Sequence, residues 1–468
     1  MIITRQEFEK YRLAEGGYDT YMLYKLITRH MGSYSRYMNL LNYYLGRHDI
    51  LQRQKSTASA SNCKIVANHA KYIVDMMVSY LVGNELQYTA SKGVNIEAVE
   101  NEYYNQDIAE VDSEIVKGMS IYGRAYELIY ADEAAAVRSA VLDPKSVFVV
   151  YDDTVKEQPL FAVSYYKRYD IDGNIIGTVC TVYDDENIWT YEGSGDSFSG
   201  MELKDEELHY FGAVPVIEYR NNYEMQGDFE QIIPLIDAYN VLMSDRVDDK
   251  ADFVDAFLFL RNIEIDSEQA KKLRVEKILM STDESGTAQY LSKILTESDI
   301  KVLRDDIKED IHRFSMVPAL TDKDFGNNLS GVAIKYKLMG FEQAVKNKEP
   351  LLRKKLKHRF EIYNNFLVLK KNAPKVEIKD IDVVFTRNLP VNDLETAQML
   401  NYLGDSVSNK TKLEQLSFVK NAKEEQGFVD EEQKKKYLEK ISEYNDKIKA
   451  TEGIAAGGGY NGDSYGRY

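Results

Sequence analysis

Carboxylates recur at helical spacing within one short segment of this chain. The segment contains Asp245, Asp248, Asp249, Asp252 and Asp255. Residues three or four positions apart share one face of a helix, so one face of this segment is expected to be acidic. Such a face can bind a divalent cation or repel an anion such as phosphate. Because the carboxylates spread along a helix instead of converging, we disfavour a metal site. A simply solvated face, or one paired with Lys and Arg of another subunit, is the more ordinary alternative.

Positive charge gathers in one later stretch of the chain. This basic stretch comprises Lys346, Lys348, Arg353, Lys354, Lys355, Lys357 and Arg359. It stands out because the formal net charge of the whole chain is −17. An acidic protein is not expected to bind bare nucleic acid tightly, since phosphate contacts require Lys and Arg. Basic runs more often pair with carboxylates of the same helix or of a neighbouring molecule than with a polyanion.

Sequence motifs of the common enzyme classes are missing. There is no Walker A motif, no GxSxG elbow and no HExxH pair, and the six histidines are scattered. Cys63 and Cys180 have no Cys or His at zinc-ligand spacing, which favours two ordinary buried thiols. The sequence therefore predicts no catalytic residue, no metal site and no cofactor.

Compartment and size follow from the same composition. The first twelve residues are charged and lack the apolar core of a signal peptide. No apolar run approaches the ~18 residues that cross a bilayer. We therefore expect a cytoplasmic protein with no membrane contact. Its 468 residues, of which 44% are hydrophobic, predict several domains or subdomains.

The elements that must position these charges are predicted by hydrophobic periodicity. The first half should contain helices at 18–45, ended by Gly46, at 62–81, capped by Asn62 and ended by Gly83, and at 107–121. Alternating β-rich runs then predict strands at 126–130, 147–151, 160–166, 178–183, 187–191 and 214–219. Asp172-Gly173 is typical of a hairpin turn. The fold class is therefore α+β.

The second half is predicted to be mainly helical. The aspartates lie on a helix at 227–256, and a short mixed region with strands at 257–260, 277–280 and 289–291 follows. A second helix covers 297–316, a polar loop follows it, and a long helix at 331–371 carries the basic stretch. Pro350 should kink that helix because it removes one hydrogen bond. Val383–Thr386 should be a strand, 393–447 helical, and the Gly-rich tail disordered.

Several segments resemble, in the same order, the portal proteins of siphophage-type tailed bacteriophages. The resemblance extends roughly from Tyr43 to Gln426. It rests on Tyr43-Tyr44-Leu45-Gly46, on 62–75 with 80–83, on Tyr122–Glu127, Leu142–Pro144 and Val149–Asp153, on Leu235–Asn240 with Ser244-Asp245, and on Asp324–Asn327 with Leu329–Lys335 and Gly340. Each piece is weak by itself, but their shared order makes coincidence an unattractive explanation.

The resemblance implies a portal fold with a mainly helical core. Its parts would be an N-terminal wing (1–226), a first stem helix (227–256), a clip (257–296), a second stem helix (297–318), a tunnel loop (319–330), a long kinked helix with a return strand (331–392), a helical crown (393–450) and a disordered tail (451–468). It also implies a homo-oligomeric ring, usually of twelve subunits, that conducts double-stranded DNA without sequence specificity at one capsid vertex during genome packaging.

The resemblance implies partners as well. These are the terminase large subunit, the major capsid and scaffolding proteins, and a head–tail connector, in a virion assembled in the host cytoplasm. A conduit must not grip its cargo, so the acidic stripe Asp245 to Asp255 would suit a channel lining. Direct contact with the DNA backbone would fall to the tunnel loop, through Asp322, Lys323, Asp324, Phe325, Asn327 and Asn328. An ordinary connecting loop is the alternative. For the basic stretch we favour pairing between subunits.

Two other functions stay open at this point. One is another head-morphogenesis or head–tail connector protein with a similar helical core, which the size of the ring would distinguish. The other is a nucleic-acid-processing enzyme with unrecognised motifs, which nuclease and ATPase assays with Mg²⁺ would detect.

Overall fold

The computed structural model divides the chain into two compact units, Met1–Asn388 and Leu389–Tyr468. The structure describes residues 1–14, 16–55, 61–254, 257–261, 287–291, 297–320, 336–387, 393–416, 419 and 422–455. The predicted tunnel-loop residues 322–328, the predicted strand 277–280 and the Gly-rich residues 456–468 lie outside these ranges.

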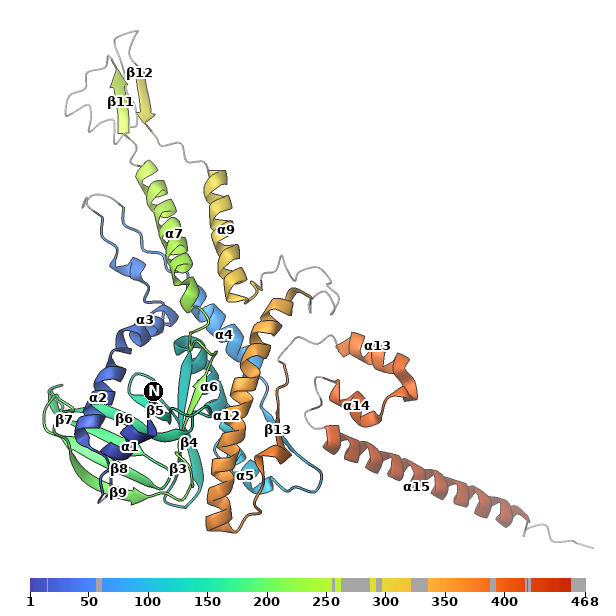
Figure 1. Cartoon of the computed structure of the whole chain (residues 1–468). Helices are drawn as coiled ribbons and strands as arrows, with labels where there is room; N and C mark the ends of the chain where they lie inside the picture. Colours follow the sequence, from blue (N-terminus) through green and yellow to red (C-terminus); the bar gives the residue numbers. More distant parts are fainter. Residues whose placement is uncertain are drawn as a thin grey trace, which may run out of the picture. The chain divides into compact units, whose positions relative to one another are not determined.

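Six helices precede or flank the first sheets (Figure 1). They are α1 (Arg5–Tyr11), α2 (Thr20–Met31), α3 (Tyr34–Tyr44), α4 (His69–Val82), α5 (Glu97–Asn105) and α6 (Ile108–Tyr122). Gly46 adopts a positive φ just after α3, and Gly83 caps α4, as predicted. The cap of α4 was predicted wrongly. Asn68, not Asn62, accepts the N–H of Lys71, so the chain before it runs without helix.

The largest sheet has six strands in the order β1-β5-β6-β7-β8-β9. Their bounds are β1 (Ile2–Ile3), β5 (Val147–Asp152), β6 (Pro159–Tyr169), β7 (Ile175–Tyr183), β8 (Asn187–Gly193) and β9 (Glu202–Leu208). All neighbours pair antiparallel except β1 with β5, and Gly173 takes the positive φ of the predicted β6–β7 turn. One face buries Phe161, Cys180 and Trp189 against α1 and α2, which forms the main aromatic core.

Two smaller sheets lie in the same part of the first unit. β3 (Arg124–Ala131) lies between β10 (Val216–Arg220) and β4 (Val137–Leu142). β2 (Gln87–Ala90) pairs with β13 (Ile381–Val384), so segments almost 300 residues apart meet in one ladder. The sequence did not predict β2, β4 or β9. Each has charged or small residues where alternation of apolar residues would mark a strand.

Two helices that follow these sheets in sequence lie beside each other, α7 (Ile233–Val254) and α9 (Glu297–Ser315) (Figure 1). We call them the helical pair. Strands β11 (Phe257–Arg261) and β12 (Thr287–Leu291) lie between the two helices in the sequence. They pair with each other in antiparallel orientation. A 3-10 turn, Glu230–Ile232, precedes α7, so the helix begins six residues later than predicted.

The longest helix of the first unit is α12 (Met339–Lys371), which packs against β10, β3, α5 and β13. It continues as one helix through Pro350, and the predicted kink stays a prediction. The second unit contains α13 (Asp393–Leu403), α14 (Asn409–Glu414) and α15 (Ala422–Ala455). Three separate helices thus form the region that was predicted as helical at 393–447.

Candidate functional site

One face of α7 binds an extended segment of the same chain through side chains four residues apart. We call residues 61–68 the strap, and Asn240, Ser244 and Asp248 the polar ladder. The Cys63 N–H donates to Asp248 Oδ1 at 2.7 Å and the Ile65 N–H to Ser244 Oγ at 2.9 Å. The Ala67 N–H donates to Asn240 Oδ1 at 2.8 Å. Every second backbone N–H of the strap, at residues 63, 65 and 67, therefore has an acceptor side chain on a successive turn of α7.

The spacing of this ladder has a simple geometric cause. Four helical residues rise about 6 Å, and two extended residues span about 6.6 Å, so the two repeats stay nearly in step over three rungs. All three ladder side chains are buried, with exposures of 0%, 0% and 2%. A buried amide without an acceptor costs about 1–3 kcal/mol, so each rung stabilises the attachment of the strap to α7.

The lower end of the ladder is fixed by an imidazole. His48 is buried, and its Nδ1 lies 2.8 Å from Asn240 Nδ2, while its Nε2 lies 2.9 Å from the carbonyl of Tyr43. The amide donates to Nδ1 and the Nε2–H donates to the carbonyl. The Tyr43 hydroxyl in turn donates to both carboxylate oxygens of Asp237 on α7, at 2.7 and 2.8 Å. The predicted Tyr43-Tyr44-Leu45-Gly46 signature thus helps to hold α7.

The upper end of the ladder explains where the predicted acidic stripe lies. Arg53 pairs with Asp245, and Lys55 pairs with Asp248 at 2.7 Å. Burial raises the pKa of Asp248, but the hydrogen bonds from Lys55 and from the Cys63 amide outweigh it and hold the pKa below its usual value. Asp248 therefore faces its own chain and does not belong to one continuous exposed stripe.

The other members of the acidic series lie differently. Asp245 is half-buried beside Arg53, and Asp249 is half-buried with an interaction of its own. The side chain of Asp252 and all of Asp255 lie outside the described residues. The three or four residue spacing correctly indicated a shared helix, but it did not indicate which neighbour each carboxylate meets.

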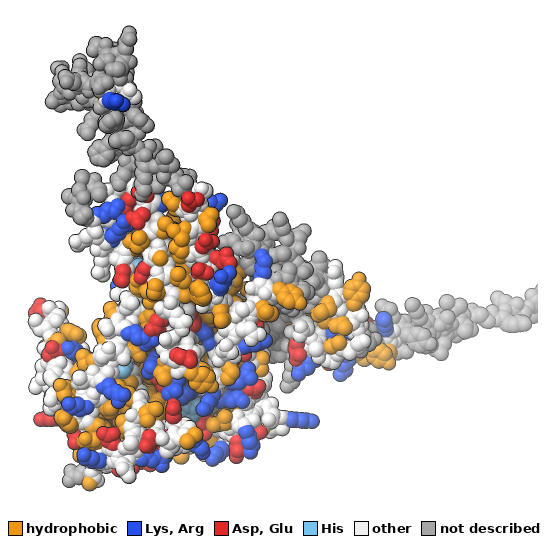
Figure 2. Space-filling view, turned by 45° about the horizontal axis from the view of Figure 1, so that its top comes forward, with side chains coloured by type: hydrophobic (Ala, Val, Ile, Leu, Met, Phe, Trp, Pro, Cys, Tyr) orange, Lys and Arg blue, Asp and Glu red, His pale blue; other side chains and the backbone are white. Residues whose placement is uncertain are grey.

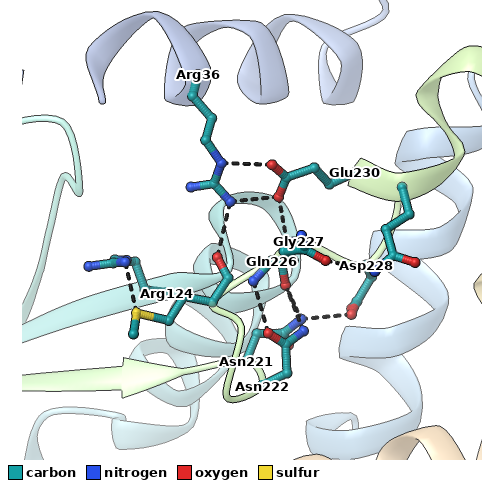
Figure 3. Close-up of polar contacts among 10 residues, drawn as sticks. Arg36, Arg124, Asn221, Asn222, Gln226, Gly227, Asp228 and Glu230 are labelled. Atoms are coloured by element: carbon teal, nitrogen blue, oxygen red, sulfur yellow. Dashed lines mark hydrogen bonds and ion pairs between the residues drawn. The ribbon is translucent and has the colours of Figure 1, made fainter. Parts of the chain in front are cut away.

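The start of α7 is joined to the body of the unit through Asp228 (Figure 3). Its carboxylate accepts hydrogen bonds from Ser120 at 2.6 Å, from Asn221 at 2.8 Å and from Lys348 at 2.5 Å. Gly227 packs so closely that a Cβ there would lie 2.4 Å from the carbonyl of Ile121. This junction ties α6, the loop after β10 and α12 to the beginning of the helical pair.

A second contact at this junction comes from α3. Arg36 binds both carboxylate oxygens of Glu230, at 2.7 and 2.6 Å, and donates to the Met225 carbonyl (Figure 3). Met225 itself has a positive φ of 56°, and its carbonyl would lie 2.0 Å from a Cβ at Gly123. Only glycine fits that approach, since any side chain would displace the loop.

The predicted basic stretch finds its partners inside the chain. Lys348 pairs with Asp228, and Arg359, which is fully buried, pairs with Asp112 at 2.7 Å and Glu127 at 3.4 Å. The other ion pairs of the stretch join Arg353 and Lys357 to Asp382 and Lys346 to Glu342. We favoured pairing between subunits. Lys348 and Arg359 are instead buried with partners of their own chain, and for the more exposed Lys346 and Arg353 pairing between subunits stays a prediction.

Two members of the basic stretch differ from the rest. Lys354 is exposed. Lys355 lies over the ring of Tyr151, 5.8 Å from its centroid, and burial lowers its pKa. The stretch is therefore mainly a set of internal attachments with two exposed cations, Lys346 and Lys354, and not a continuous basic surface.

The partner helix α9 presents its charges to solvent. It carries six carboxylates against four Lys and Arg, and Asp305, Asp306 and Glu309 are exposed. Apolar side chains are exposed beside them, with Val302 at 59%, Leu303 at 50% and Phe314 at 62%. Figure 2 shows apolar and acidic side chains mixed on this part of the surface. Sequence reasoning assigned the acidic face to α7 and missed α9, although the carboxylates of α9 were visible in the sequence.

Two histidines lie where α4 meets the helical pair. The ring of His69 lies 5.6 Å from that of His312 on α9 and 5.1 Å from that of Tyr239 on α7. Burial, and then the nearby His312, lower the pKa of His69 to about 4. Burial also lowers the pKa of His312, whose Nδ1 lies 2.9 Å from the Val317 carbonyl. The packing at this point therefore favours neutral imidazoles.

Other site types find little support in the described part of the chain. Among those residues, no group of three or more His, Cys, Asp or Glu is arranged to hold a metal ion. Within the same ranges, every helix is too short or too polar to cross a bilayer. Cys180 is buried in the sheet and Cys63 is half-buried in the strap, and neither forms a disulfide.

The sequence of the chain matches a family of known proteins. A family model described as "Phage portal protein, SPP1 Gp6-like" matches residues 23–446. The portal protein of Bacillus phage SPP1 is 25% identical over 445 residues, covering 88% of this chain and 86% of that protein. The portal protein of Clostridium phage phiCD119 is 22% identical over 431 residues, covering 86% and 94%.

Among solved structures, a chain of "Neck of empty GTA particle computed with C6 symmetry" covers 73% of this chain and 88% of its own length. Its identity is 12% and its TM-score is 0.43. The family assignment rests on the sequence matches, which extend across the sheets of the first unit, the helical pair, α12 and most of the second unit. It identifies a structural component of phage particles and not an enzyme. The chain belongs to the SPP1-like family of phage portal proteins.

Proposed function

We propose that this chain assembles into a ring of about twelve copies that surrounds a channel for double-stranded DNA at one capsid vertex. The observation that carries the proposal is the contrast within the helical pair. α7 is attached to the body by the polar ladder and by the Asp228 junction, and α9 leaves Val302, Leu303 and Phe314 exposed. Burying such side chains against a neighbouring copy would contribute about 25 cal/mol per Å².

The charges of the helical pair suit a channel that does not hold DNA. Fixed binding sites would become barriers to sliding, so exposed carboxylates serve a conduit better than exposed cations. Asp305, Asp306 and Glu309 of α9 are exposed and are the candidates for lining the channel. Half-buried Asp249 of α7 would also line it if that face of the helix points toward the axis of the ring. Weak contact with the DNA backbone would come from the tunnel loop, Asp322 to Asn328.

Partners follow from the same assignment. The ring would dock the terminase large subunit during packaging, and that partner would hydrolyse the ATP. Later it would seat a head–tail connector, for which β11 and β12 form the proposed clip. Contacts with capsid and scaffolding proteins would place it in the virion during assembly in the host cytoplasm.

The mass of the purified full-length chain in solution tests the ring. Light scattering should give about twelve times the mass of one chain. The substitutions Val302→Glu and Leu303→Glu together should release subunits, because they place charge in the proposed interface. Ile171→Glu is the matched control, since Ile171 is fully exposed in the β6–β7 turn. Equal masses for both variants would contradict this interface.

The two other functions are tested separately. A connector protein would form a ring of a different size under the same conditions. A nucleic-acid-processing enzyme would show nuclease or ATPase turnover with Mg²⁺, and the portal function predicts none from the purified chain.

A further inference from the structure

Strand β9 ends the six-stranded sheet, and among the described residues no strand pairs with its outer edge (Figure 1). All seven of its residues are exposed. The backbone N–H and C=O groups that point away from β8 therefore face solvent. An edge of this length is a ready template for another strand unless its side chains prevent pairing.

The two leucines of β9 lie on one face of the sheet, and most of its carboxylates lie on the other. Leu203 and Leu208 lie opposite Tyr191 and Asn187 of β8, on the same face as Trp189, and Glu206 lies between them, opposite Trp189 itself. Tyr191 and Trp189 are buried in the main aromatic core, whereas Leu203 is 44% and Leu208 is 65% exposed. The core-side face of the sheet therefore ends at two exposed leucines, with the exposed carboxylate of Glu206 between them.

The other face of β9 is acidic. Glu202, Asp205 and Glu207 lie opposite Glu192, Thr190 and Ile188 of β8. Lys204 pairs with Glu202, but Asp205 and Glu207 form no ion pair with any described residue. Like charges placed directly opposite each other destabilise a strand pair, so two β9 edges would repel. A second copy of this chain is therefore a poor occupant of this edge, and so is nucleic acid.

We propose that β9 is a docking edge for an extended segment of another protein in which apolar and basic residues alternate. Its backbone would add a seventh strand to the sheet. Its apolar side chains would cover Leu203 and Leu208 beside the core, and its Lys or Arg side chains would lie opposite Asp205 and Glu207. Backbone bonds supply affinity in such β-augmentation, and the alternating side chains supply specificity. This inference does not depend on the ring.

A labelled heptapeptide of alternating Lys and Val tests the proposal by fluorescence anisotropy with the full-length chain. We expect saturable binding, and we expect at least a tenfold weaker affinity when every backbone amide of the peptide is N-methylated. That peptide keeps its charge but has no backbone N–H to donate at either edge. Equal binding of the two peptides, or no saturable binding at millimolar peptide, would overturn the proposal.

Variants of the chain locate the binding. Asp205→Lys with Glu207→Lys should weaken the affinity at least tenfold. Glu133→Lys with Asp153→Lys is the matched control, because both residues are exposed and lie off β9, and it should leave the affinity unchanged. Equal losses in both variants would mean attraction by net charge alone and would refute a docking edge. Hydrogen exchange of the β9 amides can also be measured in the unaltered chain. We expect it to slow when the peptide is added, and this result does not depend on any substitution.

Discussion

The two helices of the helical pair differ in where their polar side chains lie. α7 buries Asn240, Ser244 and Asp248 against the strap, so its polar groups hold the chain's own backbone. α9 keeps Asp306 and Glu309 in solvent, beside exposed Val302 and Leu303. One helix is thus the attachment of the pair, and the other keeps apolar and acidic side chains exposed. Charge at helical spacing has no fixed meaning until its neighbours are known.

The largest effect should come from the attachment, at the Asp228 junction. Lys348→Met leaves the buried Asp228 carboxylate without its cation and should lower the free energy of unfolding by about 3–5 kcal/mol. Urea denaturation measures this change. Asp228→Asn in addition to Lys348→Met should recover part of the loss, because it removes the unpaired charge. Arg313→Met on α9 breaks only exposed pairs, with Glu309 and Asp310, and should cost under about 0.5 kcal/mol. Similar losses of unfolding free energy in Lys348→Met and Arg313→Met would contradict the view that the start of α7 is an attachment and α9 an exposed surface.

The polar ladder should show the next largest effect. Asn240→Ala deprives the Ala67 N–H of its acceptor and His48 of its donor, and should cost about 2–3 kcal/mol. Amide exchange at Ile65 and Ala67 should accelerate with it, because the strap would loosen from α7. Glu309→Gln is the control and should change neither quantity. Unchanged exchange in the Asn240 variant would show that the strap is held elsewhere.

Acid should weaken the contact of α4 with both helices. His69 titrates near pH 4 in the folded chain and near 6.5 when unfolded, so the unfolded state binds more protons in between. Stability should therefore fall as pH drops from about 6.5 toward 4, by about 1–2 kcal/mol for this partly exposed group. His69→Gln should flatten that part of a plot of Tm against pH. His30, whose pKa burial lowers to about 4 in the body, keeps its own contribution in that variant. A slope unaffected by His69→Gln would contradict the assignment.

Substitutions on α9 should have the smallest effect on stability and the largest effect on function. Asp306→Lys with Glu309→Lys should change the free energy of unfolding by about 0.5 kcal/mol or less, because both side chains are exposed. DNA packaged per particle should fall if these carboxylates line the channel. Asp248→Lys would not test the channel, because that side chain is buried and the substitution would destabilise the fold. Normal packaging by the α9 variant would argue that this face does not meet DNA.

Sequence periodicity predicted much of the fold but little of the site. The strands with apolar alternation, the helices α6, α7, α9 and α12, and the turn at Gly173 were all found close to where they were expected. β9 was missed because its sequence, ELKDEEL, has no apolar alternation, and it forms only by pairing with β8. Asn62 was chosen as a cap in place of Asn68 because local sequence does not reveal that residues 63, 65 and 67 bind to α7.

The partners of the charged residues could not be predicted for the same reason. Arg359 meets Asp112 and Glu127 across separations of more than two hundred residues, and Lys348 meets Asp228 across 120. Such long-range pairs follow from the packing of α12 on the body. A basic stretch in the sequence therefore resembles a surface patch until the packing is known.

Electron microscopy of the purified full-length chain, and of assembling heads that contain it, tests the ring most directly. We expect a closed ring of about twelve subunits in which the helical pairs surround an opening wide enough for a DNA duplex. A chain that stays monomeric in both settings, or that builds a particle with no central opening, would contradict the account.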